Sequence, residues 1–320
     1  MRGARAGLLT LLACAMATPV AAAFPEHSLT LVVGAAAGGG IDLTARILAQ
    51  GLAQALGQPV VVENRPGAGT RIASENVAKA SPDGYTLLLT TAAAAIDMDM
   101  KANAGGSDAR VLAPISTFAT TALLLAVKPT LPVQSVAALV ALARAKPGTL
   151  NFSSSGTGTI GHLCGELFRQ RTGTDIVHVP YKGAAPSAAA LAAGEVDFTF
   201  ASLPAMLPFV KAGRVRVLAN AGARRSVLLP DVPTMAEAGI SGFDASLWYG
   251  VFAPDATPRA VIDRLARAIA EVADSAAVAK QLANMGAEVY VNPAGDLAQL
   301  VRDEAARWSG VAKTANATIN

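Results

Sequence analysis

Two glycine-rich segments of this chain are suited to binding an anion. The first, GAAAGGG at residues 34–40, follows an apolar run at 29–33 and precedes an amphipathic helical pattern. The second, SSSGTGT at 153–159, has the same position between a short apolar run and a helical pattern. Glycine lets a backbone approach a ligand closely, and the first N–H groups of a helix lack partners within that helix. Each segment therefore predicts an anion site built from backbone N–H groups.

The N-terminus has the pattern of an export signal. Arg2 and Arg5 precede an apolar run at 7–17, and three alanines end at Ala23. We expect cleavage after Ala23 and release into the periplasm. The alternative is a lipoprotein modified at Cys14, although the residues before this cysteine fit a lipoprotein box poorly. Nucleotides are scarce outside the cytoplasm, so the glycine segments are interpreted as sites for another small anion.

The composition excludes several classes of function. Residues 1–23 hold two arginines and no acidic residue, so their removal lowers the net charge from +3 to +1. That balance offers no basic face for nucleic acid. The leader's apolar run is shorter than the ~20 residues of a membrane span, and no later segment qualifies. Cys164 is the only cysteine of the remaining 297 residues, so no intramolecular disulfide is possible.

Apolar, β-rich runs alternate with helical patterns, which predicts parallel sheets joined by helices. Strands are expected at 29–33, 60–62, 85–90, 122–127, 150–153, 176–179, 196–200, 215–220 and 246–253. Helices are expected after both glycine segments, near residue 72, at 139–145, at 186–193 and from 258 onward, with breaks near Gly286 and Pro293. Segment 92–110 is polar and irregular and receives no assignment.

Both glycine segments follow the carboxyl end of a strand, where open α/β sheets bind ligands. Their separation along the chain predicts two lobes with a ligand cleft between them and two crossing strands as a hinge. We expect an α/β, type II-like periplasmic binding fold in which each lobe is a mainly parallel sheet flanked by helices. Lobe 1 is assigned to residues 24–124 and 249–320, and lobe 2 to residues 125–248. This size suffices for two separate cores.

A series of short motifs occurs in one order along the chain. They are AGG at 37–39 with Asp42 and Arg46, VVENRPGAG at 61–69, PDGYT at 82–86, SGTGT at 155–159, HVPYKG at 178–183, LPDVPT at 229–234 with Glu237 and Gly239, and Trp248 followed by Ala253, Pro254, Thr257 and Pro258. Together they resemble the solute-binding receptors of tripartite tricarboxylate transporters, known as the Bug family, over nearly all of residues 24–310. No single motif is decisive, but their number and order make the resemblance specific.

The resemblance implies a receptor that closes around a carboxylated metabolite and delivers it to a membrane permease. In that family the two glycine-containing loops hold ligand carboxylates, largely through backbone N–H groups and water. The corresponding residues here are Ala37, Gly38, Gly39 and Asp42 in the first loop and Ser154, Ser155, Gly156 and Thr157 in the second. Paired helix N-termini on opposite lobes would suit a ligand with a carboxylate at each end.

Segment 92–110 departs from the family. It lacks the asparagine-proline and aspartate-phenylalanine pattern expected after Thr90 and Thr91, in a region that relatives use near the cleft. Ala37 also stands where the family often has proline. The ligand therefore stays open between dicarboxylates, tricarboxylates, acidic amino acids and aromatic acids such as nicotinate.

Several polar side chains are further candidates for ligand contact, and each has a structural alternative. Thr90 and Thr91 end a strand that is expected to face the cleft. Asp42 would repel an anion directly, so it is interpreted as a contact through water or to an ammonium group, or else as a helix cap. His162, on the first turn of its helix, is more often structural. Lys182 suits a carboxylate, although exposed lysines are common in turns.

A catalytic interpretation finds no support in the sequence. Cys164 and His162 are two positions apart on a predicted helix and so do not face each other. The three histidines form no cluster with metal-ligand spacing, and no Ser-His-Asp arrangement is indicated. We expect no enzymatic activity, no metal and no cofactor. The predicted function is capture of a small carboxylate for a tripartite permease; the alternative is a module that presents this ligand to a membrane sensor kinase.

Overall fold

The computed structural model describes residues 24–91, 112–245 and 247–314. The predicted export signal, Cys14 and segment 92–110 lie outside the described residues. The strands are β1 (Leu29–Val33), β2 (Val60–Asn64), β3 (Thr86–Thr91), β4 (Leu112–Thr121), β5 (Leu123–Val127), β6 (Asn151–Ser154), β7 (Val177–Pro180), β8 (Phe198–Ser202), β9 (Arg216–Asn220), β10 (Leu247–Pro254) and β11 (Ala287–Val289). The helices are α1 (Gly40–Leu56), α2 (Arg71–Ala78), α4 (Val136–Ala145), α5 (Ile160–Thr172), α6 (Ala184–Ala193), α7 (Leu203–Lys211), α8 (Arg259–Ala273), α9 (Ala276–Asn284) and α10 (Ala294–Thr314), and a short 3-10 helix, η1 (Ala68–Thr70), precedes α2.

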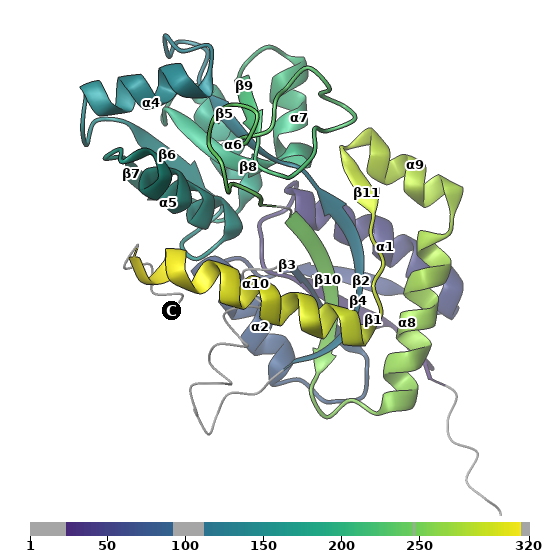
Figure 1. The fold of residues 1–320 in the computed structure, drawn as a ribbon. Coiled ribbons are helices and arrows are strands. Elements are labelled where there is room, and N and C mark those ends of the chain that lie inside the picture. The colour runs from purple at the N-terminus through teal and green to yellow at the C-terminus, as the bar shows by residue number, and fades with distance from the viewer. Residues whose placement is uncertain (1–23, 92–111, 246, 315–320) are drawn as a thin grey trace, which may run out of the picture.

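The strands form two sheets, one in each half of the molecule (Figure 1). The first has the order β11-β4-β10-β3-β1-β2, and the second has the order β7-β6-β8-β5-β9. In the first sheet β10 and β11 run against the other strands. In the second sheet only β5 does so among the strands described. The predicted pair of α/β sheets flanked by helices is confirmed: most strands of each sheet run in one direction, although the pairings are a mixture of parallel and antiparallel.

The chain crosses between the two sheets twice. Strand β4 belongs to the first sheet and β5 to the second, with Ala122 alone between them. The return runs from β9 to β10, which lies back in the first sheet between β3 and β4. The lobe boundaries expected from the sequence, after residue 124 and before residue 249, fall inside β5 and β10 and would divide these strands between the lobes. We therefore propose that the hinge lies at the two crossings, Ala122 and the segment between β9 and β10, which leaves each sheet intact as a rigid body.

The core explains why the first glycine segment is held firmly at its two ends. Strand β1 is fully covered at Leu31, Val32 and Val33, and the following helix buries Leu48 and Leu52 against the sheet. Each such fully buried side chain contributes about 1.5–3 kcal/mol relative to exposure. The helix ends at Gly57, whose left-handed conformation lets its N–H bond to the Ala53 carbonyl. The segment between strand and helix is thereby fixed in space.

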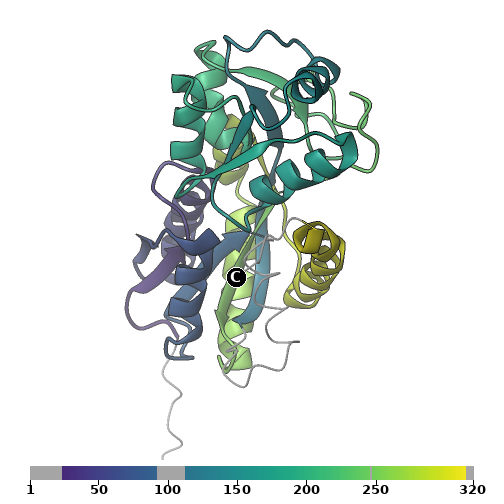
Figure 2. The same ribbon diagram turned by 90° about the vertical axis from the view of Figure 1, so that its left-hand side faces the viewer.

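The C-terminal helix links the two lobes. Helix α10 packs on β4 of the first sheet and on α5 of the second lobe. Figures 1 and 2 show it beside the first sheet, with one end below α5. Trp308 is 1% exposed on this helix, and its Nε1 donates to Glu304 at 2.7 Å. None of the helices in the described residues combines the length and hydrophobicity that a bilayer crossing needs.

Besides the short helix η1, three described elements were not expected from the sequence: β4, α7 and β11. Helix α7 carries Pro204 in its first turn, where proline is common, and Pro208 inside it, where proline usually interrupts a helix, so its pattern gives mixed signals. Strand β4 contains Pro114 and several small polar residues, so it lacks the regular alternation of apolar and polar residues that indicates a strand. Its pairing with β10 and β11 supplies the stability that its own pattern does not indicate.

Candidate ligand-binding site

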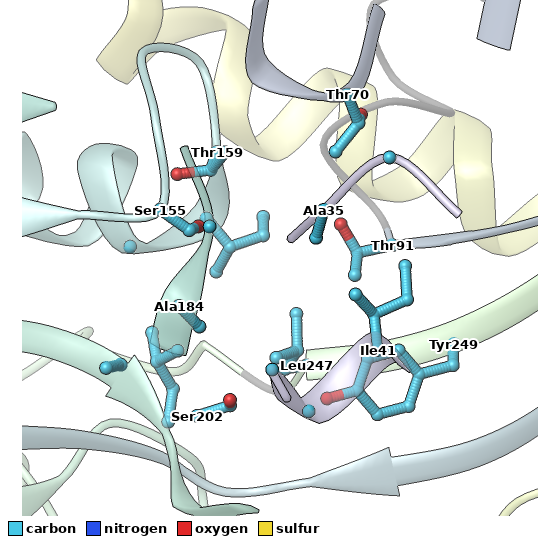
Figure 3. Close-up of a pocket in the computed structure, with 18 of the residues that line it drawn as sticks. Ala35, Ile41, Thr70, Thr91, Ser155, Thr159, Ala184, Ser202, Leu247 and Tyr249 are labelled. Atoms are coloured by element: carbon cyan, nitrogen blue, oxygen red, sulfur yellow. The ribbon is translucent and has the colours of Figure 1, made fainter. Parts of the chain in front are cut away.

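A cavity of about 60 Å³ lies between the two lobes. Its walls come from the carboxyl ends of β1, β3, β6 and β8 and from the start of β10. Figure 3 shows the lining side chains around an open centre. The position is the strand-end cleft that the sequence predicts for a ligand.

Among the described residues, five helices begin at this cavity. The lining residues at their N-termini are Gly39 and Gly40 of α1, Thr70 before α2, Thr159 and Ile160 of α5, Gly183 and Ala184 of α6, and Ser202 before α7. The N-cap residue of each of these helices makes no side-chain capping hydrogen bond. Because the first N–H groups of a helix have no partner within it, they are available to an anion here.

The electrostatics of the lining come from the backbone. Within the part of the chain that the structure describes, no lining side chain is charged. Each helix N-terminus carries a partial positive charge that stabilises an anion by about 0.3–1 kcal/mol, and by up to ~2 kcal/mol when partly buried. Convergence of several such dipoles thus gives a site for an anion without a lysine or arginine.

The two lobes touch around the cavity, so the structure has a closed cleft. The backbone N–H of Ala36 donates to the carbonyl oxygen of Lys182 at 3.4 Å. A side chain at Gly69 would collide with the carbonyl oxygen of Thr157. These contacts join the first glycine loop to the start of α6, and η1 to the second glycine loop. A ligand in the cavity would be covered on both sides.

Asp42 holds the first loop in shape. Its carboxylate accepts hydrogen bonds from the Gly38 N–H at 2.9 Å, from Arg46 at 2.9 and 3.1 Å, and from Asn64 Nδ2 at 2.9 Å. Burial raises the pKa of this carboxyl, but the bonds from Arg46, Gly38 and Asn64 outweigh that effect and hold the pKa below its usual value. The side chain is 2% exposed and does not line the cavity.

The second loop rests on a pair of histidines. The ring of His178 stacks on His162 at a centroid distance of 4.0 Å, and its Nε2 lies 2.7 Å from Ser154 Oγ. The Nδ1 atom of His162 accepts the Gly158 N–H at 3.1 Å. Burial first, and the neighbouring His162 second, lower the pKa of His178 to about 3. Both rings therefore stabilise the second loop, His178 through Ser154 and His162 through Gly158. His178 is in its neutral form.

Three of the predicted contact residues line the cavity: Gly39, Thr91 and Ser155. Alternation along β3 explains one of these outcomes, because Thr91 faces the cavity and its neighbour Thr90, fully buried, points to the other face. The remaining predicted residues lie around the cavity rather than in its lining: Ala37, Gly38, Asp42, Ser154, Gly156, Thr157, His162 and Lys182. Ala37, Gly38, Thr157 and Lys182 are on the exposed side of their loops.

The structure adds three side-chain hydroxyls that sequence reasoning missed. Thr70, Ser202 and Tyr249 line the cavity, and none of their hydroxyl oxygens has a hydrogen-bond partner of good geometry among the described residues. Burial has the larger effect on the pKa of Tyr249 and raises it, although Ser202 lies close enough for its hydroxyl to lower that pKa by a smaller amount. Ser202 is 3% exposed and Tyr249 1%. A buried hydroxyl without a partner costs about 1–3 kcal/mol, so three of them at one cavity point to a ligand that satisfies them.

A sequence signal existed for only one of these residues. Ser202 directly precedes Leu203 and Pro204, and serine before a helix with proline in its first turn is a helix start at a strand end. Tyr249 lies on the crossing strand beside Trp248, and no pattern in this apolar run distinguishes it from a packing residue. Thr70 lies three positions after Gly67 in a turn-rich loop, and nothing in the sequence distinguishes it from an ordinary turn residue.

A second cavity of about 250 Å³ lies beside the hinge. It is lined by residues of both lobes, among them Thr120, Asn220, Arg224, Arg225 and Glu288. Helix N-termini do not converge on it, and none of its lining atoms is a buried hydroxyl without a partner among the described residues. The smaller cavity is therefore the candidate ligand site.

A family model and a curated relative each match most of the chain. A family model described as "Tripartite tricarboxylate transporter family receptor" matches residues 44–317. The protein BugT of Bordetella pertussis is 37% identical over 307 residues, which cover 95% of this chain and 94% of BugT.

Solved structures show the same fold. The R. palustris protein Rpa4515, solved with adipate, is 38% identical with a TM-score of 0.85, covering 92% of this chain and 98% of that one. MatC from Rhodopseudomonas palustris, solved with bound malate, is 30% identical with a TM-score of 0.83, covering 90% and 99%.

Proposed function

Because this chain belongs to the receptor family of tripartite tricarboxylate transporters, a family of periplasmic solute-binding proteins, we propose that it captures a short dicarboxylate in the cavity between its lobes. The observation that supports this choice most is the convergence of five helix N-termini on a cavity without a charged side chain among its described lining residues. An anion suits such a site and a cation does not.

The polar groups of the lining support a ligand that is polar at both ends. Figure 3 shows Thr70 and Thr159 on one side of the cavity, and Ser202 and Tyr249 on the opposite side. Ile41 and Leu247 contribute apolar surface close to Ser202 and Tyr249. Thr91 and Ser155 lie between the two sides. A dicarboxylate places its charged groups at its two ends and its carbon chain between them. Adipate and malate, which the two solved relatives bind, have this chemistry.

Ligand capture proceeds by closure of the lobes. Each lobe contributes helix N-termini, α1 and α2 from the first and α5, α6 and α7 from the second. A carboxylate held by one lobe attracts the N-termini of the other, so the bound ligand favours the closed state. The contacts of Ala36 with Lys182 and of Gly69 with Thr157 then cover the cavity. The closed form is the one we propose to be recognised by a membrane permease.

The residues proposed to touch the ligand are those of the lining. Gly39, Thr91 and Ser155 keep this role from the sequence, and Thr70, Ser202 and Tyr249 join them. Asp42 acts on the ligand indirectly, since its four accepted hydrogen bonds fix the loop that carries Gly39. No reaction is proposed, and the protein acts by binding and release.

Export to the periplasm is part of the proposal. The basic residues, apolar run and alanines of residues 1–23 support a signal peptide cleaved after Ala23. Mass spectrometry of the protein from the periplasm of an expressing bacterium tests it. An N-terminus at Phe24 supports this cleavage, whereas a lipid on Cys14 or an intact Met1 contradicts it.

The test of ligand class is binding by the mature chain, residues 24–320, freed of co-purifying ligand by unfolding and refolding. Malate, succinate, adipate, citrate, aspartate and nicotinate are compared by thermal shift and calorimetry. A bound acid at 100 times its Kd adds about 2.7 kcal/mol of stability. Dimethyl esters of the binding acids serve as neutral controls and are expected not to bind. If no acid binds, or an ester binds as well as its acid, the proposal is wrong.

A further inference from the structure

The backbone at Thr70 is strained. Its φ is 85° and its ψ −7°, which is the left-handed region, and Ala68 in the same loop has a φ of 45°. A β-branched residue is a genuine outlier there, and such strain is usually retained where the side chain has a function. Glycine would occupy position 70 without this cost.

The hydroxyl of Thr70 is not used by the protein itself. Thr70 is the N-cap residue of α2, where a threonine hydroxyl commonly accepts an N–H of the first turn, yet no such bond is present. Its Oγ1 is buried and has no hydrogen-bond partner among the described residues. Thr70 lines the cavity, as Figure 3 shows. The capping group is thus free for a ligand.

The surrounding chain makes room for this side chain. A Cβ at Gly34 would lie 2.5 Å from the Thr70 Cβ, so only glycine at position 34 admits the threonine. Next to Thr70, the Cα of Gly69 lies against Thr157 in the other lobe, where a side chain would collide with its carbonyl oxygen. The position of Thr70 is therefore tied both to the first glycine loop and to closure of the cleft.

We infer that Thr70 is a specificity-determining ligand contact whose hydroxyl donates a hydrogen bond to a carboxylate oxygen of the bound dicarboxylate. This inference rests on the proposed function. The helix N-termini supply attraction for any small anion, whereas a hydroxyl held at one point selects the acid that places an oxygen there. The strain at Thr70 is the cost of that placement.

Variants at position 70 separate the hydroxyl from the shape of the side chain. Binding of malate, succinate and adipate is measured by calorimetry for the mature chain and for Thr70→Val, Thr70→Ser and Thr70→Gly. The valine variant keeps the branched shape and is expected to bind the preferred acid about 10- to 100-fold more weakly, the usual effect of a lost hydrogen bond to a charged group. The serine variant retains the hydroxyl and is expected to bind within about threefold of the wild type.

Ala68→Gly is the matched control. It relieves a positive φ in the same loop at an exposed residue outside the cavity lining. Neither Ala68→Gly nor Thr70→Gly is expected to lower the melting temperature of the ligand-free protein, because both remove backbone strain. Of these two glycine variants, Thr70→Gly is expected to weaken binding by about tenfold or more, and Ala68→Gly is expected to bind like the wild type.

The outcomes distinguish the inference from its premise. A wild-type chain that binds none of the three acids contradicts the proposed function and the inference together. Wild-type binding with undiminished affinity in Thr70→Val contradicts the inference alone. Weak binding in both Thr70→Val and Thr70→Ser would assign the residue a purely structural role and overturn it as well.

Discussion

The hydroxyl groups of Tyr249 and Ser202 flank the first residue of α1 from two different sheets. A Cβ built on Gly40 would lie 2.7 Å from the Tyr249 hydroxyl oxygen and 2.8 Å from Ser202 Oγ. Tyr249 lies on β10 of the first sheet and Ser202 at the end of β8 in the second. Burial raises the pKa of Tyr249 well above its usual range, so the phenol stays protonated and can donate to a ligand oxygen.

Gly40→Ala tests the space between these two hydroxyls. The added methyl group displaces both oxygens, so ligand affinity is expected to fall at least tenfold. Stability is expected to change little, since alanine is the better helix former by about 1 kcal/mol and the displaced groups are side-chain ends. Calorimetry and thermal melts measure the two effects. Gly295→Ala is the control, because a Cβ at this position on α10 meets no neighbour, and it is expected to keep wild-type affinity. Wild-type affinity in Gly40→Ala would show that the ligand does not contact the end of the cavity formed by Tyr249 and Ser202.

Tyr249→Phe removes a buried hydroxyl that lies close to Ser202 but makes no hydrogen bond of good geometry among the described residues. The ligand-free variant is expected to be as stable as the wild type or up to about 1 kcal/mol more stable, because an unsatisfied group is removed. Affinity for the preferred acid is expected to fall about 10-fold or more. Urea unfolding measures the stability, and calorimetry measures the affinity. The reverse pattern, lost stability with unchanged affinity, would show that the hydroxyl serves the fold and not the ligand.

Asp42→Asn tests the brace of the first loop. The amide cannot accept all the bonds that Gly38, Arg46 and Asn64 donate to the buried carboxylate, so we expect a loss of about 2–4 kcal/mol of unfolding free energy. The exposed pair of Arg259 and Asp263 has the same spacing on α8, with Asp263 42% exposed. Asp263→Asn is therefore the matched control, with an expected loss below about 1 kcal/mol. Equal losses in the two variants would contradict a special role for Asp42.

The stability of the protein is expected to fall on acidification below neutral pH. The pKa of His178 is about 3 in the folded state and about 6.5 when unfolded, so the unfolded chain binds the proton more readily. Stability from this group is complete above pH 6.5 and decreases as the pH falls from 6.5 towards 3. Melting temperatures at pH 7.5, 6.0 and 5.0 measure the effect. His178→Phe keeps a ring for the stack on His162 and is expected to lose less stability over that range; an unchanged pH profile would contradict the assignment.

Much of this protein could be predicted from local sequence patterns. The strand before each glycine segment and the helix after it depend on neighbours within a few residues, and the structure confirms them. The two sheets and the family followed from the order of such motifs. Elements with mixed signals, such as α7 with Pro204 and Pro208, were missed because their stability comes from packing rather than from their own pattern.

Tertiary structure decided which side chains line the cavity. Thr91 rather than Thr90 faces it because of the phase of β3 in the sheet, and Asp42 turns away because Arg46 and Asn64 bind its carboxylate. The amino-acid sequence by itself determined that each glycine loop lies between a strand and a helix, since this arrangement is a local feature. The meeting of Thr70, Ser202 and Tyr249 depends on how two lobes close on each other, and contacts between distant segments leave no periodic signal in either one.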